Sequence, residues 1–110
     1  MRQPFKTYTP QDASELLDLL GMMLLGAPTY IDEGGYFPEQ TLETVFEAFY
    51  GGLNASRSEI GDQRYEQLAA MAAEAREHFL ADPHDENGRT AQGQRLILEM
   101  EALVEGALRG

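Results

Sequence analysis

The chain has 110 residues, of which 43% are hydrophobic, so it is expected to fold as one domain with a real core. It contains no cysteine, which excludes disulfides, thiolate nucleophiles and cysteine-bound metal centres. Its net charge is −11, from 19 acidic and 8 basic residues, which argues against nucleic acid or an anionic membrane as a partner. The same charge favours a basic protein partner, if the protein has a partner, and otherwise serves solubility.

The longest apolar stretch, residues 19–27, is too short to span a bilayer. Asp12, Glu15 and Asp18 precede it, whereas a signal peptide carries positive charge at that point. The chain is therefore expected to be cytoplasmic.

The first helix is predicted from Pro10 to about Leu25, with Thr9 as its N-cap and Pro10 at the first helical position. Residues 16–25 (LLDLLGMMLL) are apolar nearly all round, which predicts a helix in the middle of the fold. Gly21 in its middle predicts the close approach of another helix.

A loop is predicted over residues 27–38, and its Gly34-Gly35 pair is compatible with a short hairpin. Pro38 is predicted to open the second helix, which has the clearest amphipathic pattern in the chain. The Gly51-Gly52 pair is predicted to end it.

The third helix is predicted to begin either at Ser56, where Glu59 completes a capping-box pattern, or after Gly61, and to end near Ala81. After a turn over residues 82–88, the last helix is predicted from about Arg89 to Leu108. Residues 1–110 are thus expected to form one all-α domain, either a small four-helix bundle or an orthogonal helical array.

An acidic stripe is the strongest feature outside the expected core. Glutamates at i, i+4 and i+8 on the second helix destabilise it slightly, so their presence favours a basic partner. Aromatic residues of the preceding loop could anchor that partner. The predicted partner-binding residues are Tyr30, Asp32, Glu33, Tyr36, Phe37, Glu39, Glu43 and Glu47. The alternative is a solvated face and a loop whose aromatics fold back onto the first helix.

A histidine–carboxylate cluster is the other candidate for chemistry. Its members, Glu74, His78, Asp82 and His84, match no specific metal-binding spacing, so a salt-bridged helix surface is the favoured explanation and a metal site is the weaker alternative. No cofactor or catalytic residue is predicted.

The leading hypothesis is a non-enzymatic protein-binding module, such as an inhibitor of a basic protein. In size, charge, lack of cysteine and expected helical content, the chain resembles the small cytoplasmic immunity proteins that block bacterial toxins. No motif carries this resemblance, so it assigns no residue roles. The alternatives are a self-associating helical module, with the first or last helix at a homodimer seam, and a small metal-dependent enzyme.

Overall fold

The computed structural model describes residues 8–30 and 40–109, and within these ranges all regular structure is helical. The helices are α1 (Ala13–Gly26), α2 (Leu42–Ala55), α3 (Arg57–Ile60), α4 (Asp62–Leu80) and α5 (Arg89–Arg109). The predicted all-α class is therefore confirmed. The predicted hairpin across Gly34-Gly35 lies outside the described residues.

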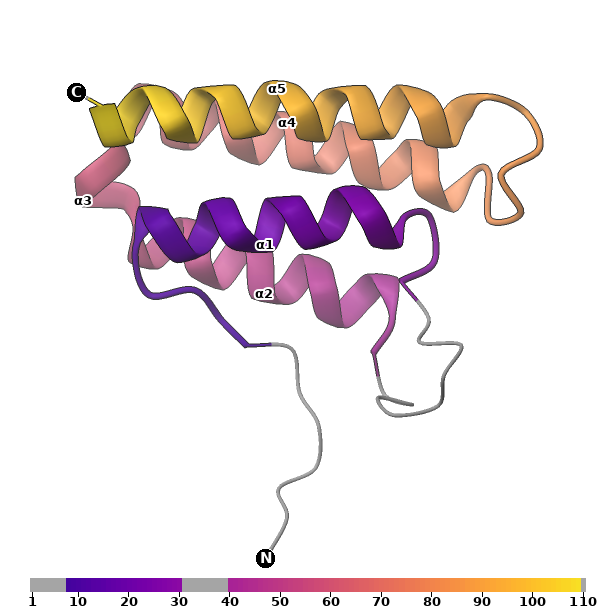
Figure 1. Ribbon diagram of the computed structural model, residues 1–110, viewed down its shortest axis with the longest axis horizontal. Coiled ribbons are helices and arrows are strands. Elements are labelled where there is room, and N and C mark those ends of the chain that lie inside the picture. The colour runs from indigo at the N-terminus through magenta and orange to yellow at the C-terminus, as the bar shows by residue number, and fades with distance from the viewer. Residues whose placement is uncertain (1–7, 31–39, 110) are drawn as a thin grey trace, which may run out of the picture.

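The four long helices run alternately in opposite directions along one axis (Figure 1). Helix α1 packs against α2 and α5, and α4 packs against α2 and α5. The two layers, α1 with α2 and α4 with α5, form an up-and-down four-helix bundle. Of the two arrangements expected from the sequence, the bundle is the one found, and α3 is the short corner between the layers.

Helix α1 begins later than predicted. Its N-cap is Asp12, whose carboxylate accepts a hydrogen bond from the Glu15 N–H at 2.9 Å, so the assignment of this role to Thr9 was wrong. Glu59 accepts a second bond, from the Ala13 N–H, at 2.9 Å. Pro10 instead lies buried against α2, ahead of the first helical turn.

Helix α2 begins later and ends later than predicted. Thr41 and Thr44 form a reciprocal capping box at its start. The helix continues through Gly51-Gly52. These glycines do not end it but make room for Thr9 and Pro10, which lie against them. A Cβ on Gly52 would lie 2.8 Å from the ring of Pro10, and one on Gly51 would lie 2.9 Å from Thr9 Cγ2.

Both predicted starts of the third helix are partly right. The short helix α3 follows Ser56, and α4 starts after Gly61, whose φ of 89° breaks the helix between them. The capping box predicted at Ser56 is absent: its side chain makes no cap bond, and Glu59 is bonded to α1 instead. The last helix agrees with its prediction to within one residue.

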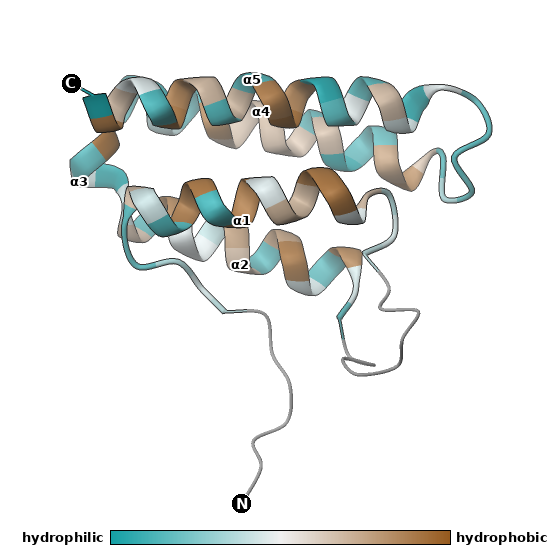
Figure 2. Ribbon diagram, viewed as in Figure 1, coloured by the Kyte–Doolittle hydropathy of each residue, from teal (hydrophilic) through white to brown (hydrophobic). Residues whose placement is uncertain are grey.

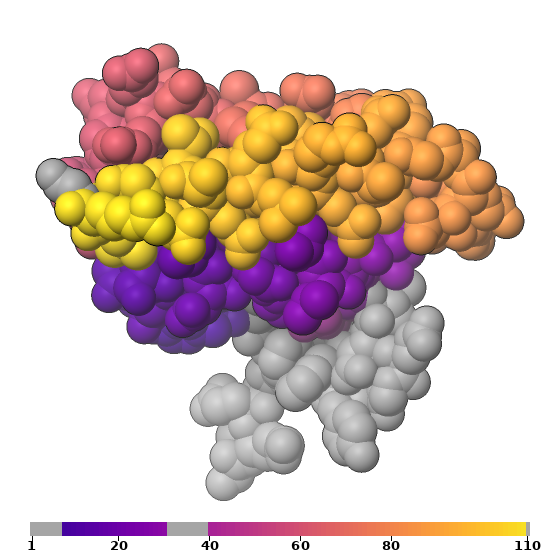
Figure 3. All heavy atoms as spheres, turned by 45° about the horizontal axis from the view of Figure 1, so that its top comes forward, coloured from indigo at the N-terminus to yellow at the C-terminus, as the bar shows by residue number. Residues whose placement is uncertain are grey.

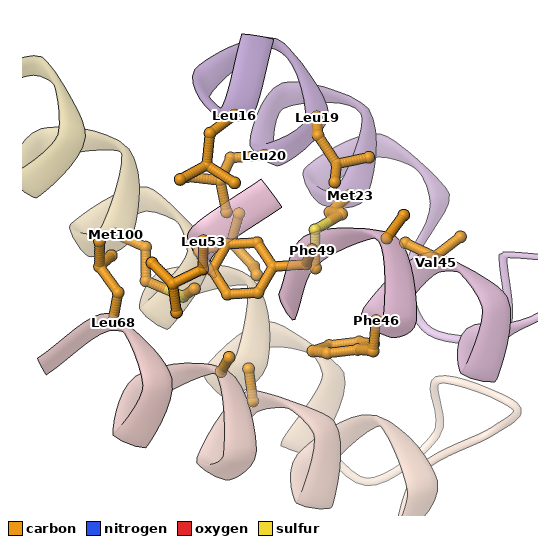
Figure 4. Packing of buried hydrophobic residues seen from close by; sticks show 14 of the residues in the cluster. Leu16, Leu19, Leu20, Met23, Val45, Phe46, Phe49, Leu53, Leu68 and Met100 are labelled. Carbon is orange, nitrogen blue, oxygen red and sulfur yellow. The ribbon is translucent and has the colours of Figure 1, made fainter. Parts of the chain in front are cut away.

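The core lies between the two layers. Figure 4 shows Leu20 and Met23 of α1 pointing toward Phe49 of α2, and all three are fully buried. Helix α1 is also the most apolar of the helices in Figure 2. However, Leu25 is 86% exposed and Asp18 is exposed, so α1 is an outer helix of the bundle and is not buried on all sides as predicted.

Candidate functional site

The structure describes three of the eight predicted partner-binding residues: Tyr30, Glu43 and Glu47. The other five lie outside the described residues, and they are Asp32, Glu33, Tyr36, Phe37 and Glu39. The predicted surface is therefore assessed on α2 and on what surrounds it.

Tyr30 is a core residue and presents no exposed ring to a partner. Its side chain is 1% exposed and meets Phe46 and Phe79 edge to face, at centroid distances of 6.2 and 5.9 Å. Its hydroxyl is buried without a hydrogen-bond partner in the described part of the chain, and burial raises the pKa of its phenol. This position contradicts the expectation that Tyr30 is an accessible anchor.

Glu43 and Glu47 lie on the exposed face of α2, as the helical period predicted. They differ in charge pairing. Glu43 accepts a hydrogen bond from Arg76 of α4 and forms an ion pair with it, although its side chain remains 64% exposed. Glu47 has no ion pair among the described residues, so its charge is available to another molecule.

Basic residues are divided unevenly between the two layers. The residues of the α1–α2 layer, 8–30 and 40–55, include no lysine or arginine. Their acids are Asp12, Glu15, Asp18, Glu43 and Glu47. All the arginines that the structure describes belong to residues 57–109, in α3, α4 and α5. Among the described arginines, only Arg76 forms an ion pair with a carboxylate of the α1–α2 layer, that of Glu43.

A groove of about 370 Å³ runs along α1, and sequence reasoning did not find it. Its described lining consists of Tyr8, Pro10, Glu15, Asp18, Leu19, Met22 and Gln40. The apolar side chains of Pro10, Leu19 and Met22 thus lie beside the carboxylates of Glu15 and Asp18 there. The only sequence signal was the i, i+3 spacing of the two acids, which places them next to each other on one face of the helix.

Glu15 is held in place at the edge of this groove. Its carboxylate accepts hydrogen bonds from the Tyr8 hydroxyl at 3.0 Å and from the Gln11 N–H at 2.8 Å. The first of these bonds raises the pKa of Tyr8, and burial and the nearby carboxylates add to the effect. The Gln40 amide, also in the lining, donates to the backbone oxygen of Tyr30 at 2.7 Å.

Asp82 organises the turn between α4 and α5. Its carboxylate accepts hydrogen bonds from the N–H groups of Glu86, Asn87 and Thr90 at 2.7, 3.3 and 2.9 Å. Burial acts to raise the pKa of this carboxyl, but the N–H donors outweigh it, so the pKa is below its ordinary value. Asp82 therefore has a structural role that already uses both of its oxygens.

The other metal candidates are not brought together. His78 lies 3.7 Å from Glu74, one turn away, and its Nδ1 accepts a hydrogen bond from Arg89 at 3.2 Å. His84 is exposed in the turn. Within residues 8–30 and 40–109, no three histidine, aspartate or glutamate side chains form a group suited to a metal ion.

None of the helices that the structure describes is long and apolar enough to cross a membrane. Comparison of the chain with protein-family models, with curated proteins and with solved structures gives no match.

Proposed function

We propose that this protein is a small acidic protein-binding module whose α1–α2 layer docks on a basic surface of another protein. The observation that carries the proposal is the placement of the bases: the described part of this layer has five acids and no base, whereas residues 57–109 interleave six arginines with eleven acids. A surface of acids without interspersed bases attracts a basic partner and repels acidic ones. Inhibition of that partner in the cytoplasm, as an immunity-type protein would achieve, is the form of this function that the composition favours.

The charges would govern the approach, and apolar contacts would hold the complex. An exposed ion pair contributes only about 0–1 kcal/mol, so a tight complex requires buried anchors near the centre of its interface. Because Tyr30 is in the core, the aromatic anchors that remain from the sequence are Tyr36 and Phe37.

The experiment is to measure association kinetics with a partner captured from the source cell and then purified. Glu47→Lys is the better charge reversal, because Glu43 is paired with Arg76 and reversing it would break that bridge. The matched control is Glu99→Lys on α5, which makes the same change at an exposed acid of the other layer.

Glu47→Lys should slow association, on the order of tenfold at low salt, and reduce its salt dependence. Glu99→Lys should have a much smaller effect. Equal association rates for the wild-type protein and the Glu47 variant would refute docking through this layer.

Self-association is the second candidate, and two observations on α1 favour it. Leu25 is 86% exposed, and Gly21 has no close neighbour that requires a glycine, since an added Cβ would come no nearer than 3.7 Å to Glu101 Oε2. Both residues belong to α1, and Figure 3 shows α1 beside α5 on the face in view. Sedimentation of the wild-type protein and a Leu25→Gln variant tests it, and a monomer at high concentration excludes it.

A further inference from the structure

We propose that the groove along α1 receives a lysine-bearing apolar segment of a protein partner. The lysine methylenes would lie over Leu19 and Met22, and its ammonium would lie between Glu15 and Asp18. This inference rests on the proposed function, because it states where the basic partner is gripped and by which chemistry.

The size and floor of the groove suit a peptide segment. Its volume of about 370 Å³ falls within the range of sites that bind small molecules or several side chains. Leu19 is 7% exposed, Pro10 is buried, and Met22 is partly buried and packs against the core. Methionine is flexible and polarisable, which lets such a floor adapt to an aliphatic chain.

The edge of the groove selects a cation. Asp18 is exposed and Glu15 partly so, and neither has an ion pair among the described residues. Hydrogen bonds from Tyr8 and Gln11 fix the Glu15 carboxylate, so little ordering is needed on binding. Lysine has the matching form, because its apolar stem lies along hydrophobic surface while its charged end stays at the edge.

The exposed Tyr8 ring adds to this selection. It is 62% exposed, and its hydroxyl is already used by Glu15, so its face is free to meet a cation or an aliphatic chain. The groove has no arginine in its described lining, which disfavours an anionic ligand. A second copy of this chain would bring another charge of −11 and is disfavoured for the same reason.

The chain itself contains one competing occupant. Residues 1–7 include Arg2 and Lys6 and no acid, so the test must separate this segment from an external peptide. The probe is a blocked peptide of alternating leucine and lysine, and the comparison probe has glutamate in place of each lysine. Binding is followed by NMR shifts of the full chain, with methyl signals of Leu19 and Met22 as the local readout.

The lysine peptide should shift the signals of Leu19, Met22 and Gln40, and the glutamate peptide should not. Asp18→Asn should weaken binding about two- to fivefold, whereas the matched control Glu99→Gln on α5 should leave it unchanged. Met22→Gln, which keeps the charge of the rim and alters only the floor, should also weaken binding.

Shifts elsewhere on the protein, equal effects of Asp18→Asn and Glu99→Gln, or unchanged binding by Met22→Gln would overturn the groove as the binding site. Tighter binding in an Arg2→Gln/Lys6→Gln variant would also overturn it, because the chain's own segment would then be the occupant. Shifts of Leu19 that depend on protein concentration without peptide would assign the groove to a second copy. A native partner that responds to Glu47→Lys and not to Asp18→Asn would leave the proposed function standing and refute the groove.

Discussion

Replacing Gly93 of α5 with alanine should destabilise the protein, although alanine is the better helix former. The Cβ would lie 2.5 Å from Cε1 and 2.8 Å from Cζ of Phe79, closer than real side-chain contacts allow. Phe79 is 1% exposed and packs against Tyr30 and Phe46, so its ring has little room to retreat. Overpacking costs about 1–3 kcal/mol, and helix propensity returns about 1 kcal/mol. The 2.5 Å approach to a ring with little room to move places the cost in the upper part of that range, about 2–3 kcal/mol, so the net expectation is a loss of about 1–2 kcal/mol.

Gly21→Ala in α1 is the matched control, because it makes the same change in another helix interior. There the nearest atom to the new Cβ is Glu101 Oε2, at an ordinary contact distance of 3.7 Å. This variant should gain up to about 1 kcal/mol from helix propensity alone.

Urea and thermal unfolding followed by circular dichroism would measure both variants, and each kcal/mol should shift Tm by roughly 4–8 °C. Replacing the ring with a smaller side chain, in a Phe79→Leu background, should reduce the loss of stability caused by Gly93→Ala, since the two residues are in contact. A Gly93→Ala protein as stable as the wild type, or two glycine variants that shift in the same direction, would refute the packing described for Phe79.

Three further substitutions probe other parts of the fold by urea unfolding. Asp82→Asn should destabilise the protein at neutral pH. Because folding lowers the pKa of Asp82, the difference in free energy of unfolding between the variant and the wild type should shrink as pH falls from about 5 through the folded-state pKa. A loss of stability that does not depend on pH would show that the charge of Asp82 does not cause it. Tyr30→Phe should leave stability unchanged or raise it by about 1 kcal/mol, because it removes a buried hydroxyl that has no partner among residues 8–30 and 40–109; a clear loss would contradict that assignment. Thr41→Ala should cost about 1 kcal/mol by removing the cap of α2, and no loss would place the start of the helix elsewhere.

Local pattern predicted the long helices well and their ends poorly. The last helix was placed to within one residue because Ile97, Met100 and Val104 repeat at helical spacing and are all buried. The Gly51-Gly52 pair was misread as a helix end because the need for glycine there comes from Thr9 and Pro10, about 40 residues away. A contact of that kind leaves no trace in the neighbouring sequence.

The candidate site shows the same limit. The helical period was enough to place Glu43 and Glu47 on an exposed face, since it depends on α2 alone. It could not show that Arg76 of α4 pairs with one of them, or that Tyr30 turns inward to meet Phe46 and Phe79. The groove was missed because its described walls come from Tyr8, Pro10, α1 and Gln40 together, which are not neighbours in the sequence.

The turn held by Asp82 also bears on the order in which the chain folds. Helices α4 and α5 are neighbours in sequence and pack along each other, so bringing them together closes a loop of only residues 81–88. The entropy lost in such a short closure is small compared with that for α1 and α5, which are separated by more than 60 residues. The α4–α5 hairpin is therefore expected to form early, and α1 is expected to dock later. Destabilising substitutions at Asp82 should then slow folding, whereas those in α1 should mainly accelerate unfolding.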